Sequence, residues 1–359
     1  MPKKISQVQI AKELGVSQSL VSIVLNGRKE GIAESTYDRI WDFALKNGYS
    51  PKGMKLPEGA GQSAMRTVGY FLRAPLRLAN KSNFFSHIAQ GLHDYLSEQQ
   101  VNMVFLGSES DITPAELRTA TWQKKPLSGI VVMGQVKPNF LAAARELGTP
   151  LVYVSARSPG FCHSVNANEY QSAEQLVDHL YNLGHRKFAY LGGLCAKSRN
   201  DERFQGLVDA LARHDITVPD EAVLNMDDAE QKQGHQMTGE LLKLPAEQLP
   251  TAWICVNGML ARGVVNRLYQ EGLKVGDDIS VAAYDNTRVV YDELPGICSA
   301  HSIPEDLGRE AGRIVLNPDL HAGESLLDVV LPSTMSPRET SGPAPAQVPD
   351  RIRSLRPVS

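Results

Sequence analysis

The 359-residue chain is poor in cysteine and aromatic residues, and its net charge is only −3. Its four cysteines are far apart and have no metal-ligand spacing, so the sequence predicts reduced, buried thiols rather than disulfides or a metal centre. It has no run of about 18 apolar residues, and its first residues are charged and amphipathic. We therefore expect no membrane partner, no secretion signal and a cytoplasmic location.

Motifs of the common enzyme classes are also missing from the sequence. It has no nucleophile elbow, no phosphate-binding glycine loop followed by Lys-Ser or Lys-Thr, and no metal-binding cluster. Histidines such as His185 and His235 have no evident partner in the sequence. We therefore predict no catalytic residues, no metal site and no cofactor, and we expect that the protein is not an enzyme.

Positive charge is concentrated near the start of the chain. Residues 1–61 contain nine Lys and Arg against six Asp and Glu, a local net charge of +3. The remainder of the chain therefore carries −6. A basic end on an acidic body suits contact with the phosphates of a nucleic acid, and the chain length suits two or three domains.

Residues 6–26 have the pattern of two short helices around a turn. In the first helix Val8, Ala11 and Leu14 recur at helical spacing, and Ser6 can cap its N-terminus. Gly15 can end this helix because glycine adopts the left-handed conformation at little steric cost. The second helix would carry an apolar face on residues 20–25.

Two helices around such a turn form a helix-turn-helix, whose second helix lies in the major groove of DNA. Ser17 can cap the second helix, and the polar side chains of Gln18, Ser19 and Ser22 near its start suit contact with bases and phosphates. The alternative is that both helices only build a small core, without contacting DNA.

The pattern Val8-x-Ile10-Ala11-x4-Val16-Ser17-x3-Val21-Ser22-x3-Asn26, followed by Gly48-Tyr49-Ser50-Pro51, resembles the headpiece of the lactose-repressor (LacI) family. The resemblance continues almost to the end of the chain. It implies a transcription regulator, either a repressor or an activator, that binds a near-palindromic operator under control of a small-molecule effector. It also implies a dimer or tetramer, and the lack of a terminal leucine heptad repeat favours a homodimer. From these residue types and the resemblance together, the predicted DNA-contacting positions are Ser6, Ser17, Gln18, Ser19, Ser22, Ile23, Asn26, Arg28, Lys29 and Leu56.

The first domain boundary is predicted at a linker. We assign residues 1–49 to the helix-turn-helix domain, with a third helix near 34–46, and residues 50–66 to a hinge rich in Gly and Pro. The resemblance implies a hinge helix that inserts a leucine into the minor groove, but Glu58 occupies that leucine's position. Leu56 or Met54 could take the role of that leucine. Equally, residues 50–66 could be a loose linker that only tethers the headpiece to the rest of the chain.

Residues 67–341 alternate between buried strands and amphipathic helices, which predicts two α/β lobes with parallel sheets. The resemblance implies the fold of periplasmic sugar-binding proteins. We predict one lobe from about 67–163 with 297–325 and the other from 164–296 with 326–341. The tail, 342–359, lacks apolar periodicity and is predicted to be disordered. The fold class is thus an all-α headpiece followed by a two-lobe α/β effector domain.

A small-molecule effector is expected beyond the carboxyl ends of the strands, where the two lobes face each other. The resemblance alone implies that this effector is sugar-like. The predicted contacts are Phe84, Ser155, Arg203, Asn257 and Asp285. Alternatives stay open: Arg203 could form a structural ion pair, Asp285 could cap a turn and Phe84 could be a core residue.

Three positions depart from the family pattern and keep the ligand class open. Gly258 and Ser155 stand where acidic residues are usual, and Ala229 stands where an aromatic residue often stacks. Arginines near the predicted cleft, at 73, 77 and 199, keep an anionic ligand as an alternative. The competing function is a ligand-binding or sensing protein of the same fold that does not regulate DNA.

Overall fold

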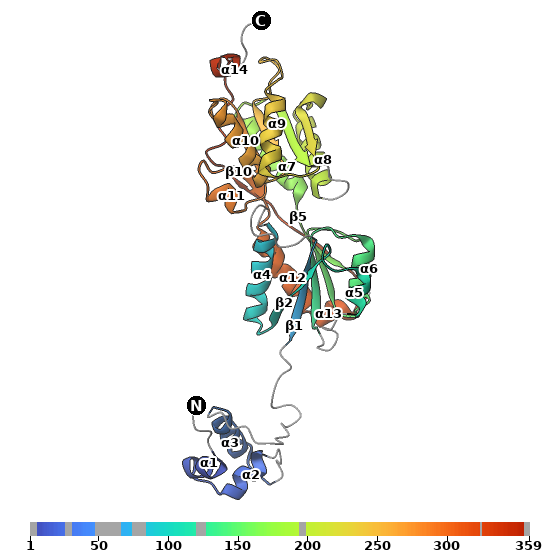
Figure 1. Cartoon of the computed structure of the whole chain (residues 1–359), viewed down its shortest axis with the longest axis vertical. Coiled ribbons are helices and arrows are strands. Elements are labelled where there is room, and N and C mark those ends of the chain that lie inside the picture. Colours follow the sequence, from blue (N-terminus) through green and yellow to red (C-terminus); the bar gives the residue numbers. More distant parts are fainter. Residues whose placement is uncertain are drawn as a thin grey trace. The chain divides into compact units, whose positions relative to one another are not determined.

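The chain forms two units, residues 1–65 and 66–359, which we describe separately (Figure 1). The computed structural model describes residues 6–25, 31–46, 66–73, 84–119, 127–193, 199–323 and 325–354. Most of the predicted hinge, including Leu56, lies outside these ranges. Within them no single helix is long and apolar enough to cross a membrane; α1 and α2 meet that test only as a pair bent by 115°.

The first unit contains three helices, α1 (Gln7–Leu14), α2 (Gln18–Leu25) and α3 (Glu34–Lys46). Ser6 caps α1 as predicted, because its hydroxyl accepts from the Gln9 N–H at 3.3 Å while the Gln9 side chain accepts from the Ser6 N–H at 2.9 Å. Gly15 ends α1 at φ 65°, in the left-handed region. The helix-turn-helix geometry expected from the sequence is therefore present.

The helices pack around a small apolar core. It consists of Ile10, Ala11, Val21, Val24, Leu25, Tyr37, Ile40, Trp41 and Ala44. The predicted apolar face of α1 is wrong at one position, because Val8 is 57% exposed and Ile10 is fully buried instead. A helix has only a few core-facing positions per turn, and packing against α2 and α3 selects Ile10 and Ala11.

The second unit begins with a six-stranded sheet in the order β11-β5-β4-β3-β1-β2, with every described pair parallel. Its strands are β1 (Thr67–Leu72), β2 (Asn102–Ser108), β3 (Gly129–Met133), β4 (Leu151–Val154), β5 (His163–Ala167) and β11 (Asp328–Leu331). Its helices are α4 (Phe84–Glu98), α5 (Pro114–Thr119), α6 (Pro138–Arg145), α12 (Pro304–Val315) and α13 (Pro318–Ala322).

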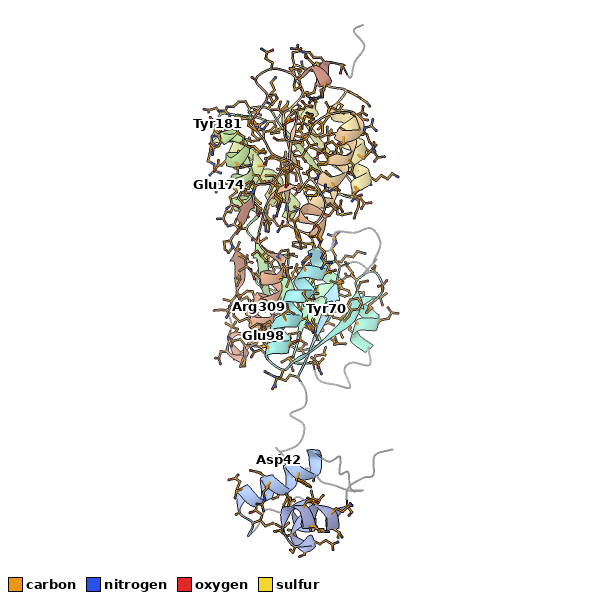
Figure 2. All side chains as sticks on the ribbon, turned by 90° about the vertical axis from the view of Figure 1, so that its left-hand side faces the viewer. Asp42, Tyr70, Glu98, Glu174, Tyr181 and Arg309 are labelled. Carbon is orange, nitrogen blue, oxygen red and sulfur yellow. The ribbon has the colours of Figure 1, made fainter. Side chains whose placement is uncertain are left out.

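Side-chain alternation along the strands gives this first sheet two covered faces. In β3, Val131 and Met133 join the core under α4 and α12, whereas Ile130 and Val132 join the core under α5 and α6 (Figure 1). Arg309 of α12 pairs with Glu98 of α4 at 2.9 Å on the surface of this lobe (Figure 2).

The second sheet has the order β12-β10-β9-β8-β6-β7, and only β12 runs antiparallel among the described pairs. Its strands are β6 (Phe188–Gly193), β7 (Val223–Met226), β8 (Ala252–Cys255), β9 (Ser280–Tyr284), β10 (Cys298–His301) and β12 (Thr334–Ser336). Its helical elements are α7 (Glu169–Asn182), α8 (Arg199–Ala212), η2 (Asp220–Ala222), α9 (Gln231–Leu241), α10 (Gly258–Gln270), α11 (Arg288–Tyr291) and α14 (Asp350–Ser354).

Helix α7 packs against α8 and α9 packs against α10, and one large core lies beneath them. Cys255 and Cys298 lie in this core and Cys162 lies in the first lobe; all three are buried and unpaired, as predicted. Cys195 lies outside the described residues. The predicted class, a helical headpiece followed by two α/β lobes, is confirmed.

The predicted crossings between the lobes are displaced by several residues. Strand β5 belongs to the first sheet, so that lobe continues past 163, and β10 places residues 298–301 in the second sheet rather than the first. Strand β11 likewise belongs to the first sheet. Strand β5 is polar in sequence but buried, and Ser164 and Asn166 of β5 donate to Asp328 of β11. Apolar patterning therefore does not reveal β5.

The prediction of a disordered tail is wrong for residues 342–354. The Gly342 carbonyl lies 3.0 Å from His185 Nε2, and the Ala344 N–H donates to the Leu183 carbonyl at 2.8 Å. Ile352 is only 5% exposed in the second-lobe core, and Arg351 pairs with Asp278 at 2.9 Å. A few specific anchors thus order a segment that has no apolar period.

Candidate functional site

The exposed face of α2 is polar, as the helix-turn-helix interpretation requires. Gln18 and Ser19 are exposed, Ile23 is 42% exposed and Ser22 is half-buried at the edge of the core. The Ser17 hydroxyl accepts from the Leu20 N–H at 3.2 Å and therefore caps α2. The other predicted DNA contacts on this unit, Asn26, Arg28 and Lys29, lie outside the described residues.

In the second lobe, Arg203 of α8 lies in a buried ion pair. Its Nε donates to Glu169 Oε2 at 2.7 Å and its Nη2 donates to Glu169 Oε1 at 3.2 Å. Its Nη1 donates to the Val256 carbonyl at 2.5 Å. The two side chains are only 6% and 2% exposed, so this bidentate pair is shielded from water. Of the two alternatives given for Arg203, the structure shows the structural ion pair, and the acidic partner is Glu169.

Asp285 adds a second negative charge near the same guanidinium. Burial favours the neutral form of Arg203, but the carboxylates of Glu169 and Asp285 outweigh burial and raise the pKa of Arg203. The Tyr284 hydroxyl donates to the Arg203 carbonyl at 2.9 Å, and the guanidinium lies 5.1 Å from the Tyr284 ring centre. Arg203 is therefore charged and held by three elements, α7, α8 and β9.

Asn257 and Asp285 also hold the backbone at the carboxyl ends of β8 and β9. The Asn257 side chain accepts from the Leu260 N–H at 2.8 Å and so caps α10, while its amide donates to the Ala229 carbonyl at 2.9 Å. Asp285, at φ 100°, accepts from the Gly258 N–H at 3.3 Å. A Cβ at Gly258 would lie 2.2 Å from Val290, which explains why no acidic side chain stands there.

Ser155 follows β4 in the first lobe and adopts φ 56°. Its hydroxyl is buried and has no hydrogen-bond partner among the described residues. Two residues later, Arg157 forms an ion pair across the lobes with Glu202, the neighbour of Arg203, and also bonds Asp328 at 3.0 Å. This bridge brings the segment that carries Ser155 close to the segment that carries Arg203.

Phe84 is a core residue, and the prediction that its ring stacks on a ligand is not supported. It is 6% exposed and packs edge-on against Phe85 with ring centres 5.4 Å apart. Its ring belongs to the core under α4 and α12. Among the arginines that kept an anionic ligand open, Arg73 is exposed, while Arg77 and the side chain of Arg199 lie outside the described residues.

The sequence analysis missed Glu169, Arg157 and Glu202. Glu169 carries a weak signal, since an acidic residue in the first turn of a helix is common for reasons of helix stability alone. Arg157 and Glu202 are 45 positions apart in the chain, and no local pattern pairs them. Of the predicted residues, the structure brings together Arg203, Asp285 and the backbone beside Asn257.

Known proteins resemble the chain over most of its length. Residues 177–341 match a periplasmic binding protein-like domain family. The HTH-type transcriptional repressor PurR of Actinobacillus pleuropneumoniae is 23% identical over 86% of this chain and 89% of its own length. The PurR of Glaesserella parasuis is 25% identical over 84% and 86%. The chain is therefore similar to LacI-family transcription regulators over most of its length.

A solved structure also matches this chain in fold. The complex of the transcriptional regulator CelR with cellobiose has a TM-score of 0.67 at 22% identity, over 94% of this chain and 99% of CelR. That coverage includes both the headpiece and the two lobes. The fold expected from the family resemblance is therefore the fold observed.

Proposed function

We propose that this protein is a sequence-specific DNA-binding repressor of the LacI family, whose operator affinity is controlled by a small molecule bound between the lobes. The observation that carries the proposal is the capped α2 helix, which presents Gln18 and Ser19 outward from a packed core. The same chain carries a two-lobe body, and its relatives include repressors over nearly the whole length. A ligand that prefers one lobe arrangement would then shift the population of DNA-binding states.

The DNA contacts are proposed on and around α2. Gln18, Ser19 and Ser22 are assigned to base edges, and Ile23 is assigned to apolar contact with thymine methyl groups. Ser6 and Ser17, at the helix starts, are assigned to phosphates. The remaining predicted contacts, Asn26, Arg28, Lys29 and Leu56, stay predictions because they lie outside the described residues.

The effector is proposed to be a carbohydrate that is bound without being chemically changed. Ser155 supplies an unpartnered buried hydroxyl, and Asp285 and Asn257 supply acceptors and donors at the strand ends. Two related regulators support this class, since one structure holds cellobiose and an Enterococcus faecium LacI-family regulator holds ribose. Incubation of the protein with these sugars, followed by product analysis, tests for turnover.

We further propose a cytoplasmic homodimer that binds a near-palindromic site. Strand β2 is the edge of the first sheet, with Val104 and Phe105 38% and 41% exposed. A hollow of about 360 Å³ beside it has apolar residues such as Phe85, Met103 and Phe105 in a lining that also contains polar side chains. An exposed apolar edge strand is usually covered, and a second copy would cover it while presenting two headpieces. Sedimentation should give twice the chain mass.

Selection of bound DNA from a random pool, with and without cell metabolites, tests the central proposal. The selected site should be near-palindromic, and Gln18→Ala and Ser19→Ala should each reduce discrimination between that site and single-base variants. The expected loss is about 1–3 kcal/mol at the contacted base pair. Unchanged discrimination in both variants would contradict these base contacts.

The matched control is Asp42→Asn on the exposed face of α3 (Figure 2). Loss of one negative charge should change affinity for all DNA sequences alike and leave discrimination unchanged, because phosphate attraction is independent of sequence. Recovery of no preferred site from the pool would reject the repressor proposal and favour a ligand-binding protein without DNA regulation.

A further inference from the structure

The chain crosses between the two lobes three times, and hydrogen bonds join these crossings to one another. The Asn168 N–H, between β5 and α7, donates to the Leu331 carbonyl at 3.0 Å. The Ser302 hydroxyl, between β10 and α12, donates to the same carbonyl at 2.9 Å. Any rotation of one lobe against the other must therefore take place about this bonded set of crossings.

The third crossing is anchored on both sides. Up to Leu331 the chain pairs with β5 of the first sheet. Two residues later, the Ser333 N–H donates to Gln171 Oε1 of α7 at 2.7 Å, and the Ser333 hydroxyl lies 2.6 Å from the Ser172 hydroxyl. The chain thus passes from one lobe to the other at Pro332, so this part of the hinge is short.

Arg157 joins the lobes at a point outside these crossings. It follows β4 in the first lobe, and its Nε donates to Asp328 Oδ2 of β11 in the same lobe at 3.0 Å. Its Nη1 donates to Glu202 Oε1 of α8 in the second lobe. One guanidinium therefore bonds two carboxylates that belong to different lobes and would separate if the lobes turned apart.

The two carboxylates are held in different ways. Asp328 Oδ1 accepts from the Ser164 hydroxyl and from the Asn166 amide, so Asp328 is fixed to the neighbouring strand β5. Glu202 belongs to α8 and moves with the second lobe. When the lobes part, Arg157 can therefore stay bound to Asp328 while Glu202 leaves it.

Partial exposure allows the contact between Arg157 and Glu202 to break and form again. Both side chains are 30% exposed. Water can therefore hydrate the Glu202 carboxylate after it separates, whereas a fully buried carboxylate would be left without solvation. A contact of this kind shifts the balance between two lobe arrangements without making either one permanent.

We propose that Arg157 is a reversible latch, which favours the closed lobe arrangement by bonding Glu202 and stays on Asp328 when the lobes open. The latch sets the fraction of closed molecules before any ligand binds. Its regulatory consequence rests on the effector control proposed above. A ligand that binds only the closed lobes loses affinity in proportion to the closed fraction, so loss of the latch weakens its binding.

Energy transfer between dyes on the two lobes tests the latch in the full-length protein, without DNA or effector. The dyes are attached through non-natural amino acids at Asn139 and Gln248, which are exposed on different lobes, and labelled chains are mixed with excess unlabelled protein. Glu202→Gln should lower the ratio of closed to open molecules roughly two- to fivefold. Glu202→Lys, which repels Arg157, should lower this ratio further.

A double-variant comparison and two controls separate the latch from other effects. Arg157→Gln should act like Glu202→Gln, and combining the two substitutions should cause no additional loss. Glu174→Gln, which removes a carboxylate from an ion pair within the second lobe, should leave the ratio unchanged. Added salt should lower the ratio in the wild type but not in Glu202→Gln, whose neutral side chain leaves no ion pair to screen.

Two results would overturn the proposal. One is a closed-to-open ratio in Glu202→Lys that equals the wild-type ratio. The other is additive loss from Arg157→Gln and Glu202→Gln, which would mean that the two side chains act separately. DNA is absent from these measurements, so an unchanged ratio leaves the repressor proposal standing, and a failed operator selection leaves the result on the lobes standing.

Discussion

The inner and outer ends of the α7–α8 helix pair carry the same kind of contact in opposite surroundings. Glu169–Arg203 at the inner end and Glu174–Arg213 at the outer end both join a carboxylate of α7 to a guanidinium at 2.7 Å. Arg203 lies in α8, and Arg213 directly follows that helix. The inner side chains are 2% and 6% exposed, while the outer ones are 44% and 57% exposed. Figure 2 shows Glu174 at the outer edge of the second lobe.

The comparison shows that the distance between two charges alone does not decide how much an ion pair contributes to the free energy of unfolding. An exposed pair exchanges water contacts for a screened attraction of small net value. Breaking a buried pair leaves a charge that neither water nor protein satisfies. The inner end should therefore respond strongly to substitution and the outer end weakly, although their geometries match.

Arg203→Ala should have the largest effect on stability. It removes the guanidinium that binds both oxygens of the buried Glu169, and the free energy of unfolding should fall by about 3–5 kcal/mol. Urea denaturation at neutral pH measures this change. A loss below about 1 kcal/mol would contradict the view that the inner pair is shielded from water.

The buried histidine of β10 should make stability depend on pH, because burial also disfavours a charge that is gained by protonation. His301 is 6% exposed, and burial, reinforced by Arg338 and opposed by Glu305, lowers its pKa to about 4. The unfolded chain, with an ordinary histidine pKa of about 6.5, then binds the proton first as pH falls. His301 should therefore cost roughly 2 kcal/mol of stability between pH 7.5 and pH 5.

Replacing the histidine by asparagine isolates its contribution. His301→Asn should lose less stability than the wild type over this pH interval, as measured by urea denaturation at both pH values. His93→Asn, on the exposed surface of α4, is the control and should follow the wild type. Equal pH dependence of all three proteins would show that His301 does not titrate with a lowered pKa.

Tyr284→Phe should have a smaller effect at the inner end. It removes the hydroxyl that donates to the Arg203 carbonyl while keeping the ring, so the expected loss is about 1 kcal/mol by urea denaturation. Tyr181→Phe, at the partly exposed outer end of α7 (Figure 2), should change stability by less than about 0.5 kcal/mol. Similar losses in both variants would erase the contrast between the two ends.

Arg213→Ala should have the smaller effect of the two ion-pair substitutions. Its partner Glu174 is exposed and returns to water, so the loss should stay below about 1 kcal/mol and should shrink further at high salt. Urea denaturation at low and high salt measures both quantities. A salt-independent loss as large as that of Arg203→Ala would refute the proposed role of burial.

The helix-turn-helix was largely predictable from sequence because its signals are local. Ser6, Gly15 and Ser17 act within three or four residues of their own positions, and the structure shows each in its predicted capping role. Several strands of the body, such as β3, β4 and β9, were predictable because they are continuous apolar runs. Strand β5 was not, since its polar side chains Ser164 and Asn166 bond to the distant Asp328.

For the candidate effector site, the sequence predicted which residues lie at the strand ends but not which partners their side chains bind. Arg203 and Asp285 follow from family resemblance and from the rule that ligands bind beyond strand ends. Whether Arg203 faces a ligand or an internal acid depends on Glu169, which lies 34 positions earlier in the chain. The order of the tail likewise depends on distant anchors, such as the pair between Arg351 and Asp278.

Local patterning in the amino-acid sequence was thus sufficient for the headpiece, the alternating lobes and the resemblance to the LacI family, because helix caps, apolar periods and turn residues act over a few positions. Only the tertiary structure decided the partners of the buried charges and the points where the chain crosses between lobes. Those outcomes depend on which distant side chains share a site without water, and the energy of a charge there is set by its surroundings.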